Sequence, residues 1–275
     1  MSQAILLGTQ RVGTNMLGSL FMSHPGIVAF PEVFKDTVSA DNPFPERIPN
    51  YRKFAFDRIR QGVELALPEY RTVLINDYFD MLEAETRPPT PVQVIGVKYN
   101  SLHHADGYWR APSDPPDMLK VFRNRGMPII HVIREDLVAT AYSELRAQSS
   151  QTYITRVPRV VEPHRFRVEP ADFLHRLRRI RDDRSMVERW LARTGLKVLV
   201  LQYEHLFVEE PASDIRGSSI ELIAEFLDLD PDGFDPAPKT RKISPVSFSD
   251  ELENFDEIEK AVRGTEFHAW FIRHA

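Results

Sequence analysis

The segment Ala4-Ile-Leu-Leu-Gly-Thr-Gln-Arg-Val-Gly-Thr-Asn-Met-Leu-Gly-Ser-Leu-Phe21 combines an apolar run, a glycine-bounded turn and a helical pattern. Residues 5–7 predict a short buried strand, and residues 8–13 predict a small polar turn. Thr14 is the expected N-cap of a helix whose apolar residues recur at helical spacing. A strand, a glycine turn and a helix start direct backbone N–H groups at an anion, so this segment predicts an anion-binding loop.

The spacing of Gly8 and Gly13 matches the start of a Walker A loop, but the rest of that motif is missing. Thr14 and Asn15 stand where the motif has Lys followed by Ser or Thr, and the cation is Arg11, inside the loop. Hydrolysis of ATP or GTP is disfavoured because the loop lacks the lysine and the Mg²⁺-bound hydroxyl. The pattern favours a cradle for a phosphate-like group that needs no metal. The alternative is a plain strand-to-helix turn, although Arg11 and the side-chain donors exceed what a turn needs.

The composition is that of an ordinary globular protein, since 42% of the 275 residues are hydrophobic and 27% are charged. We expect one α/β domain over residues 1–275, with variable inserts near residues 41–91 and 147–170. The net charge of −5 gives no global basic field, so neither nucleic acid nor a membrane surface is an expected partner. The absence of cysteine excludes disulfides and Cys-based metal sites and fits a cytoplasmic protein. No apolar run is long enough for an integral membrane segment.

Glu32 comes directly after Pro31, at the end of a short apolar strand predicted over residues 27–30. This position is the carboxyl end of a strand, which is where open α/β sheets bind ligands. Glu32 is therefore a candidate general base for an acceptor hydroxyl. Equally, it is a candidate helix N-terminal residue whose charge complements the helix dipole.

Lys98 ends the strand predicted over residues 92–98. If the sheet is parallel, that strand ends on the same side as Gly8. We therefore favour a cation directed into the site over an edge lysine that extends to solvent. His103 and His104 follow in a loop. They are weaker candidates, because loop histidines are more often surface residues than catalysts.

Arg134 follows the strand predicted over residues 128–133. Ser143 lies nine residues further along, on a helix that Asp136 is expected to cap. Two donors in this arrangement predict a site for a second phosphate beside the first loop. The alternative is an arginine in a salt bridge and a serine packed against a neighbour.

The remaining apolar patterns complete an alternating α/β chain. The arginines of residues 176–181 are expected to form a solvated helix face paired with acids. Helices are predicted over residues 51–67, 71–85, 117–125, 171–194 and 218–229, and a further buried strand over residues 197–203.

Three motifs follow one another along the chain. They are Gly-Thr-Gln-Arg-x-Gly-Thr between the first strand and helix, Pro-Glu-x-Phe shortly afterwards, and Arg-Glu-Asp-x₆-Ser after a later strand. Together they resemble sulfotransferases that use 3′-phosphoadenosine 5′-phosphosulfate (PAPS). Their order and spacing are closer to bacterial carbohydrate sulfotransferases of the Nod-factor and trehalose type than to the cytosolic phenol and steroid enzymes. The latter usually carry a lysine in the first loop and a C-terminal Arg-Lys-Gly loop.

The resemblance covers both ends and the middle of the chain but neither insert. It implies a P-loop-like three-layer fold with a central, mostly parallel sheet flanked by helices. A Tyr-Glu-x-Leu segment at Glu204 also resembles the family and is expected to be structural. A basic segment near the C-terminus resembles the Nod-factor type and implies that Arg241 or Lys242 approaches the nucleotide, with exposure at the surface as the alternative.

The resemblance also implies roles for single residues. Arg134 and Ser143 would bind the 3′-phosphate of PAPS, and Glu32 would take the acceptor proton. Lys98 would stabilise the transferred group. His103 is a candidate for contact with the acceptor from its loop position alone, not from the resemblance. In that family the first loop binds the 5′-phosphosulfate. The resemblance therefore implies the same role for the matching residues here, which are Gln10, Arg11, Val12, Gly13, Thr14 and Asn15.

The sequence therefore predicts in-line transfer of a sulfuryl group from PAPS to a hydroxyl acceptor, with PAP as the nucleotide product and no metal. The acceptor is a carbohydrate, a glycolipid or a secondary metabolite, and the sequence does not choose among them. A P-loop nucleotide kinase or NTPase and a non-catalytic nucleotide-binding module are the alternatives. A homo-oligomer is compatible with the sequence.

Overall fold

The computed structural model describes residues 2–35, 50–61, 68–86, 91–106, 114–150, 165–208, 214–237 and 247–274. Lys242 lies outside the described residues, as does the middle of the insert expected at residues 147–170.

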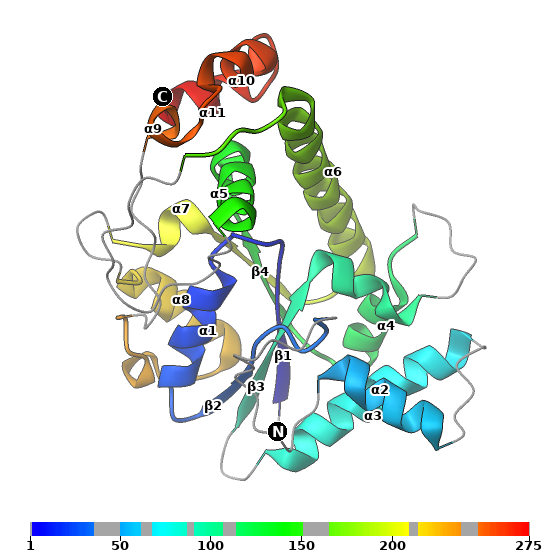
Figure 1. Cartoon of the computed structure of the whole chain (residues 1–275). Coiled ribbons are helices and arrows are strands. Elements are labelled where there is room, and N and C mark those ends of the chain that lie inside the picture. The colour runs from blue at the N-terminus through cyan, green and yellow to red at the C-terminus, as the bar shows by residue number, and fades with distance from the viewer. Residues whose placement is uncertain are drawn as a thin grey trace.

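Five parallel strands form one sheet in the order β2-β3-β1-β4-β5, which confirms the expected α/β fold with a parallel sheet (Figure 1). The central strand β1 pairs with β3 on one side and β4 on the other, and Gly8 at its end lies beside Lys98 and Val132. The predicted strand ends thus meet at one edge of the sheet. The strands are β1 (Ser2–Gly8), β2 (Ile27–Phe30), β3 (Val92–Lys98), β4 (Ile129–Ile133) and β5 (Val198–Gln202).

Helices cover both faces of the sheet (Figure 1). The α-helices are α1 (Thr14–Ser23), α2 (Tyr51–Arg60), α3 (Pro68–Glu85), α4 (Asp117–Asn124), α5 (Leu137–Ser150), α6 (Pro170–Thr194), α7 (Tyr203–Leu206), α8 (Gly217–Leu227), α9 (Phe248–Glu251), α10 (Phe255–Val262) and α11 (His268–Phe271). Short 3₁₀ helices are η1 (Tyr99–Ala105), η2 (Pro231–Gly233) and η3 (Ile272–His274).

Alternation along β1 separates two apolar cores. Ala4 and Leu6 belong to the core shared with α1 and α8, whereas Ile5 and Leu7 belong to the core shared with α3, α4 and the end of α6. Because successive strand residues point to opposite faces, a fully apolar strand such as β1 is suited to burial between two helical layers. The sequence pattern and the three-layer arrangement therefore agree.

A third core lies where the C-terminal helices α9, α10 and α11 pack on α5 and α6, far from the start of β1 (Figure 1). At its centre the fully buried Glu251 carboxylate accepts hydrogen bonds from Arg146 Nε at 2.7 Å, from Arg146 Nη2 at 2.9 Å, and from the Tyr142 hydroxyl. This buried charge pair ties the C-terminal segment to α5. Helix α5, which follows Arg134, is therefore anchored by the C-terminal segment.

Three details differ from the sequence prediction. Helix α3 begins at Pro68, because a proline at the first helical position lacks only an N–H that would have no partner there. Thr14 is the first residue of α1, and the N-cap is Gly13 with φ of 90°. Strand β5 is only partly buried, and Val200 is 51% exposed, because β5 lies at the sheet edge.

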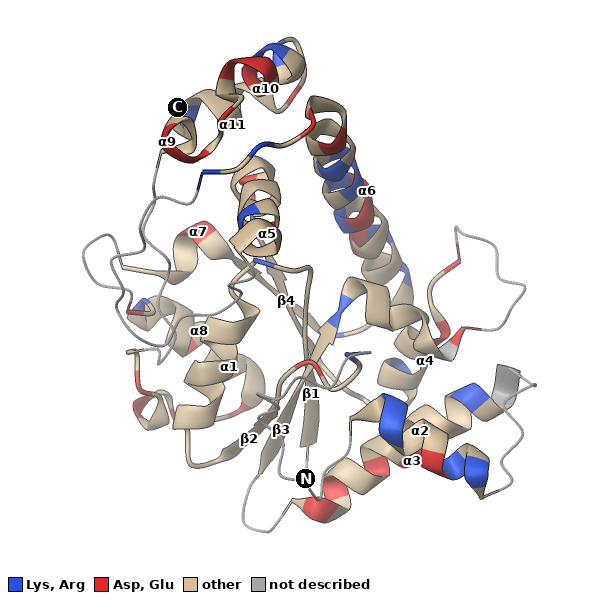
Figure 2. Cartoon of the chain, viewed as in Figure 1, with Lys and Arg blue, Asp and Glu red and all other residues tan. Residues whose placement is uncertain are grey.

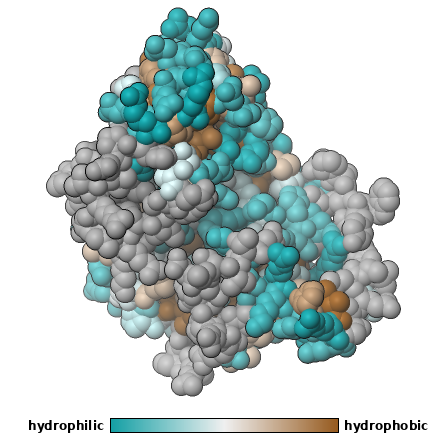
Figure 3. Space-filling model, in the orientation of Figure 1, coloured by the Kyte–Doolittle hydropathy of each residue, from teal (hydrophilic) through white to brown (hydrophobic). Residues whose placement is uncertain are grey.

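The arginines of α6 do pair with acids, as expected (Figure 2). Arg176 and Arg179 both contact the Glu144 carboxylate, at 2.6 and 3.3 Å. The visible surface in Figure 3 is mainly hydrophilic, with a brown patch where Figure 1 places α2. That helix exposes Phe56 and Ile59 among basic residues.

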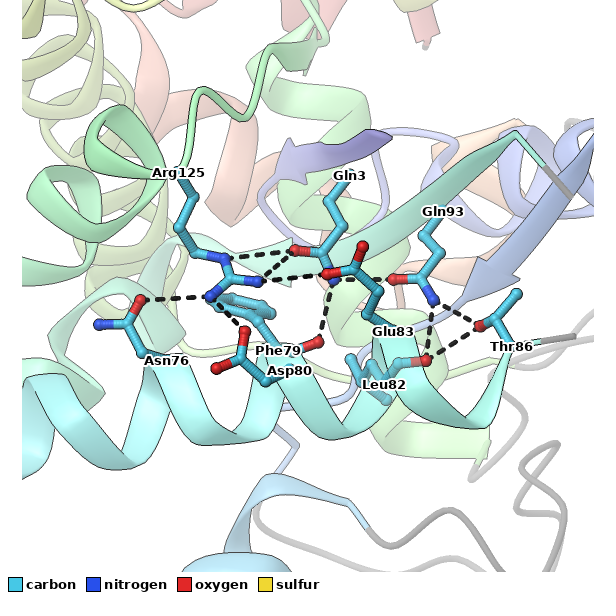
Figure 4. A network of polar contacts seen from close by, with 9 residues as sticks. All are labelled: Gln3, Asn76, Phe79, Asp80, Leu82, Glu83, Thr86, Gln93 and Arg125. Atoms are coloured by element: carbon cyan, nitrogen blue, oxygen red, sulfur yellow. Dashed lines mark hydrogen bonds and ion pairs between the residues drawn. The ribbon is translucent and has the colours of Figure 1, made fainter. Parts of the chain in front are cut away.

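Two buried glutamines fasten α3 to the amino-terminal ends of β1 and β3 (Figure 4). Gln3 Nε2 donates to the Phe79 carbonyl at 3.0 Å and to Gln93 Oε1 at 2.7 Å. Gln93 Nε2 donates to the Leu82 carbonyl at 2.8 Å and to Thr86 Oγ1. Gln3 Oε1 accepts from Arg125 Nε at 3.3 Å and from its Nη2 at 3.1 Å. Each buried amide group therefore has a partner, which permits polar side chains at these strand positions.

We expect Gln93→Met to lower the free energy of unfolding by about 1–3 kcal/mol, because the Gln3 amide then loses a buried acceptor. Urea denaturation measures this loss. Gln61→Met is the matched control, since Gln61 is exposed at the end of α2 and the same change there should stay within about 0.5 kcal/mol. Equal effects at both positions would contradict a stabilising role for the network.

Candidate functional site

The loop between β1 and α1 folds back tightly on the sheet. A Cβ on Gly8 would lie 2.9 Å from Val12 Cγ2 and 3.2 Å from the Val132 carbonyl. Gly13 has a left-handed φ of 90°, and no side chain caps the start of α1. The first N–H groups of a helix have no partner within it, so this helix start can receive an anion. Gly8 is needed for close approach, whereas Gly13 is needed for its left-handed conformation and also because a Cβ there would lie 2.9 Å from the Tyr203 ring.

Arg11 and Arg134 bring two guanidinium groups to one corner of this loop. Arg11 adopts a left-handed φ of 63°, and its Nε donates to Ser143 Oγ at 2.9 Å. Arg134 stacks on Tyr203, with 4.5 Å between its guanidinium carbon and the ring centroid. Burial lowers the pKa of Arg11, and the charge of Arg134 lowers it further. Two like charges so close favour an anion between or beside them.

Arg134 has one buried donor that nothing in the described part of the chain satisfies. Its Nε is out of contact with solvent and has no hydrogen-bond partner there, while its Nη1 lies 3.5 Å from the Arg11 carbonyl. A buried polar group without a partner is rare in proteins and requires an explanation such as a missing ion or water. This orphan donor supports an anion site at the corner.

Lys98 spans from β3 to the loop. Its Nζ donates to Thr14 Oγ1 at 2.6 Å and to the Thr9 carbonyl at 3.2 Å, and it lies 3.3 Å from Glu32 Oε1. The side chain is only 12% exposed, and burial lowers the pKa of Lys98, an effect that Glu32 partly offsets. The lysine that the loop itself lacks is thus supplied by the neighbouring strand.

Glu32 owes its position to Gly96. A Cβ on Gly96 would lie 2.8 Å from the Glu32 backbone nitrogen, so the chain after β2 crosses directly over this glycine. Glu32 has a left-handed φ of 41°, which is uncommon outside glycine. Such conformations concentrate at functional sites. The turn after β2 therefore brings a carboxylate to the Lys98 ammonium.

A small cavity of about 20 Å³ lies beside this ion pair. It runs between α1 and the ends of β1, β2 and β3, and Thr14, Asn15, Glu32 and Lys98 form its polar part. The carboxyl edge of a parallel sheet is the usual position of ligands in α/β proteins.

The structure brings most of the predicted residues together. The contacts above join Arg11, Thr14, Glu32, Lys98, Arg134 and Ser143 in two groups, one on either side of the loop. Gln10 is exposed on the loop and Asn15 lines the cavity, whereas Val12 is buried in the core so that only its backbone can meet a ligand.

His103 turns elsewhere, with its Nδ1 2.6 Å from Asp106 Oδ2 and its ring against Trp190. The interpretation of Glu204 as structural agrees with its contacts. Its carboxylate accepts from the N–H groups of Glu135 and Asp136, at 3.2 and 3.1 Å, just before α5.

The sequence analysis did not identify Gly96 or Tyr203 as residues of the site. The only sequence signal for Gly96 is a glycine inside an apolar strand, which marks a bulge or a close approach of another backbone. The signal for Tyr203 is its place after β5 at the carboxyl edge of the sheet, where its ring contacts Arg134 and blocks any side chain at Gly13.

A comparison with protein-family models finds no match, and a search among curated proteins finds none either. Function must therefore be argued from the site itself. In the part of the chain described above, the helices are all too short or too polar to cross a lipid bilayer.

We expect Gly96→Ala to destabilise the protein by about 1–3 kcal/mol, because the new methyl group collides with the Glu32 backbone. Gly18→Ala is the matched control. Nothing lies within 4 Å of a Cβ there, and alanine is the better helix former, so this change should stabilise by about 0.5–1 kcal/mol. Thermal and urea unfolding measure both. A neutral Gly96→Ala would mean that the Glu32 turn can move away from β3.

Proposed function

We propose that this protein transfers a sulfuryl group from PAPS to a hydroxyl acceptor. The observation that carries the proposal is the position of Lys98, whose ammonium contacts both Thr14 of the anion loop and the Glu32 carboxylate. Lys98 thus connects the anion-binding loop to Glu32, the candidate general base. The sulfotransferase-like order of motifs supports the same assignment. A cytoplasmic location, inferred from the composition, belongs to this proposal.

The 5′-phosphosulfate and the 3′-phosphate of PAPS are assigned to different groups of residues. The 5′-phosphosulfate is assigned to the loop and the start of α1, where backbone N–H groups and the helix dipole favour negative charge. The 3′-phosphate is assigned to Arg134 and Ser143. The Arg11–Ser143 hydrogen bond extends this second group, so we add Arg11 to the residues that would bind the 3′-phosphate. Charge-assisted hydrogen bonds from arginine are the strongest means of holding phosphate.

In the proposed reaction the acceptor O–H gives its proton to the Glu32 carboxylate while its oxygen forms a bond to sulfur. The bond between sulfur and the bridging phosphate oxygen breaks, and its electron pair leaves with PAP. Lys98 would stabilise the negative charge that grows on the bridging oxygen and the transferred group. As in phosphoryl transfer, positioning and electrostatics would supply most of the rate enhancement. That no metal takes part remains a prediction.

A P-loop kinase or NTPase is the second candidate. It is favoured by the same Lys98, which brings a lysine to the loop from another strand. Mg²⁺-dependent turnover of ATP would support this candidate over sulfuryl transfer.

Isothermal titration with PAP and with AMP tests the nucleotide site, because only PAP carries the 3′-phosphate. We expect PAP to bind more tightly than AMP, and binding to be unchanged by EDTA. Arg134→Ala should weaken PAP about 10- to 100-fold, as expected for loss of a charged hydrogen bond, and should leave AMP nearly unchanged. Arg178→Ala, on the exposed face of α6, is the control. Equal weakening of both nucleotides would remove Arg134 from the 3′-phosphate site.

Glu32→Gln should lower turnover of PAPS by about 10²- to 10⁴-fold, since the amide cannot accept the proton, while PAP affinity stays the same. Release of PAP is followed with 4-nitrophenol and with trehalose as acceptors. Glu221→Gln, an exposed carboxylate on α8, is the control. Loss of PAP binding instead would give Glu32 a binding role, and PAP binding without any turnover in the unaltered protein would favour a non-catalytic module.

A further inference from the structure

Helix α2 has an inner side that is fixed to the rest of the protein. The first N–H group of the helix donates to the Val33 carbonyl at 2.9 Å. The Phe54 ring lies 5.2 Å from the Tyr78 ring of α3, measured between centroids, and Arg58 contacts the Asp77 carboxylate of α3 at 3.0 Å. These contacts all come from one side of α2. The helix is thus held in place without the residues of its outward side.

The outward side of α2 exposes two large apolar side chains. Phe56 is 55% exposed and Ile59 is 40% exposed. On α3, Val73 is 49% exposed and lies one turn before Asp77, the residue that Arg58 contacts. Figure 3 shows the resulting brown patch where Figure 1 places α2. Single exposed apolar residues are ordinary, whereas a group of them on two packed helices indicates a surface of contact.

Cations surround the apolar residues of α2 (Figure 2). Arg52, Phe56 and Arg60 follow one another at intervals of four residues, so they lie in one row along the helix. The guanidinium carbon of Arg60 lies 4.8 Å from the centroid of the Phe56 ring. Lys53, three residues before Phe56, is exposed as well. Asp57 is the one acid of α2, beside four basic residues, so the helix has a local positive charge.

This local charge attracts an anionic surface although the whole protein does not. The net charge of −5 gives no overall attraction to anionic lipid. At physiological ionic strength, however, exposed charges act over only about 8 Å, so distant acids are screened from a surface that α2 meets. Near an anionic membrane each Lys or Arg strengthens binding about fivefold. Apolar side chains that enter between the headgroups add to this attraction.

A lipid surface suits this side of α2 better than a protein partner does. Ten residues of helix are about 15 Å long and about 10 Å wide. A stable protein interface buries about 800 Å² on each partner, which is several times the area that the helix offers. Headgroups and acyl chains accommodate a protruding Phe56 and Ile59 without a complementary surface, whereas a protein would need a matching groove.

We propose that the outward side of α2, formed by Arg52, Lys53, Phe56, Ile59 and Arg60, binds the surface of an anionic membrane. The two apolar side chains enter the headgroup region, and the three cations contact lipid phosphates. The contact is peripheral and reversible, as is usual for a short amphipathic helix. It goes beyond the proposed sulfuryl transfer and does not depend on it, because no residue of the candidate site takes part.

Sedimentation with lipid vesicles tests this proposal. Vesicles of equal parts phosphatidylcholine and phosphatidylglycerol should bind the protein, and vesicles of phosphatidylcholine alone should not. The double variant Phe56→Ser and Ile59→Ser should weaken binding about tenfold or more, because the apolar insertion is lost. The double variant Arg52→Gln and Arg60→Gln should weaken it about 10- to 30-fold, and added salt should weaken it for the same reason.

Two matched double variants are the controls. Leu222→Ser with Ile272→Ser removes exposed apolar residues of α8 and η3, and Arg178→Gln with Arg189→Gln removes exposed cations of α6. Both should bind the anionic vesicles as the unaltered protein does. All the substituted side chains are exposed, so circular dichroism and urea unfolding should show every variant folded.

Three results would overturn the proposal. They are equal binding to the two kinds of vesicle, binding to neither, and binding that either α2 variant leaves unchanged. Soluble polyglutamate is a further probe of the same cations. If it binds more tightly than the anionic vesicles, and if the double variant at Arg52 and Arg60 abolishes that binding, the face belongs to an acidic protein and the membrane assignment is wrong.

Discussion

The ammonium of Lys98 is the group on which the rest of the candidate site depends, because it makes contact with two separate segments. It meets the loop at Thr9 and Thr14 and the turn after β2 at Glu32. A buried charge is costly unless paired and hydrogen-bonded, so these contacts together offset the cost of burying the lysine. The sheet order makes this possible, since β3 lies between β1 and β2 and its last residue is next to Gly8. The same contacts that stabilise the cation therefore fix the distance between the carboxylate and the anion loop.

Glycines provide the space in which that arrangement fits, and they do so in different ways. Gly8 and Gly96 allow backbone to pass at less than the contact distance of a methyl group, whereas Gly18 leaves a place unfilled. The tight contact at Gly96 and the open space at Gly18 both border the small cavity between α1 and the sheet.

The sequence was sufficient for the strands, for the helices as far as α8 except the short α7, and for most of the candidate-site residues, because each of these depends on local pattern. Apolar runs predicted the strands, and Glu32, Lys98 and Arg134 were identified because they lie at or just after the ends of these strands. What failed or was missed depends on the fold as a whole. The exposure of β5 follows from its place at the edge of the sheet, which no local pattern reveals. The Arg11–Ser143 bond joins residues 132 positions apart, and Gly96 has meaning only once the turn after β2 is known to cross it.

The C-terminal helices affect the candidate site although they are far from Arg134 and Ser143 in the sequence. Arg134 and Ser143 flank the first turns of α5, so their positions relative to Arg11 are set by how firmly α5 is held. Ion pairs also hold α5 against α6, since the buried Glu144 carboxylate of α5 contacts Arg176 and the more exposed Arg179. The Arg146–Glu251 pair is different, because the carboxylate is fully buried and accepts two arginine hydrogen bonds and one from Tyr142. Breaking a pair of this kind costs about 3–5 kcal/mol, so α5 cannot shift without detaching the C-terminal helices. The candidate site for a second anion is therefore held in place by the C-terminal core, although its residues lie outside the C-terminal helices.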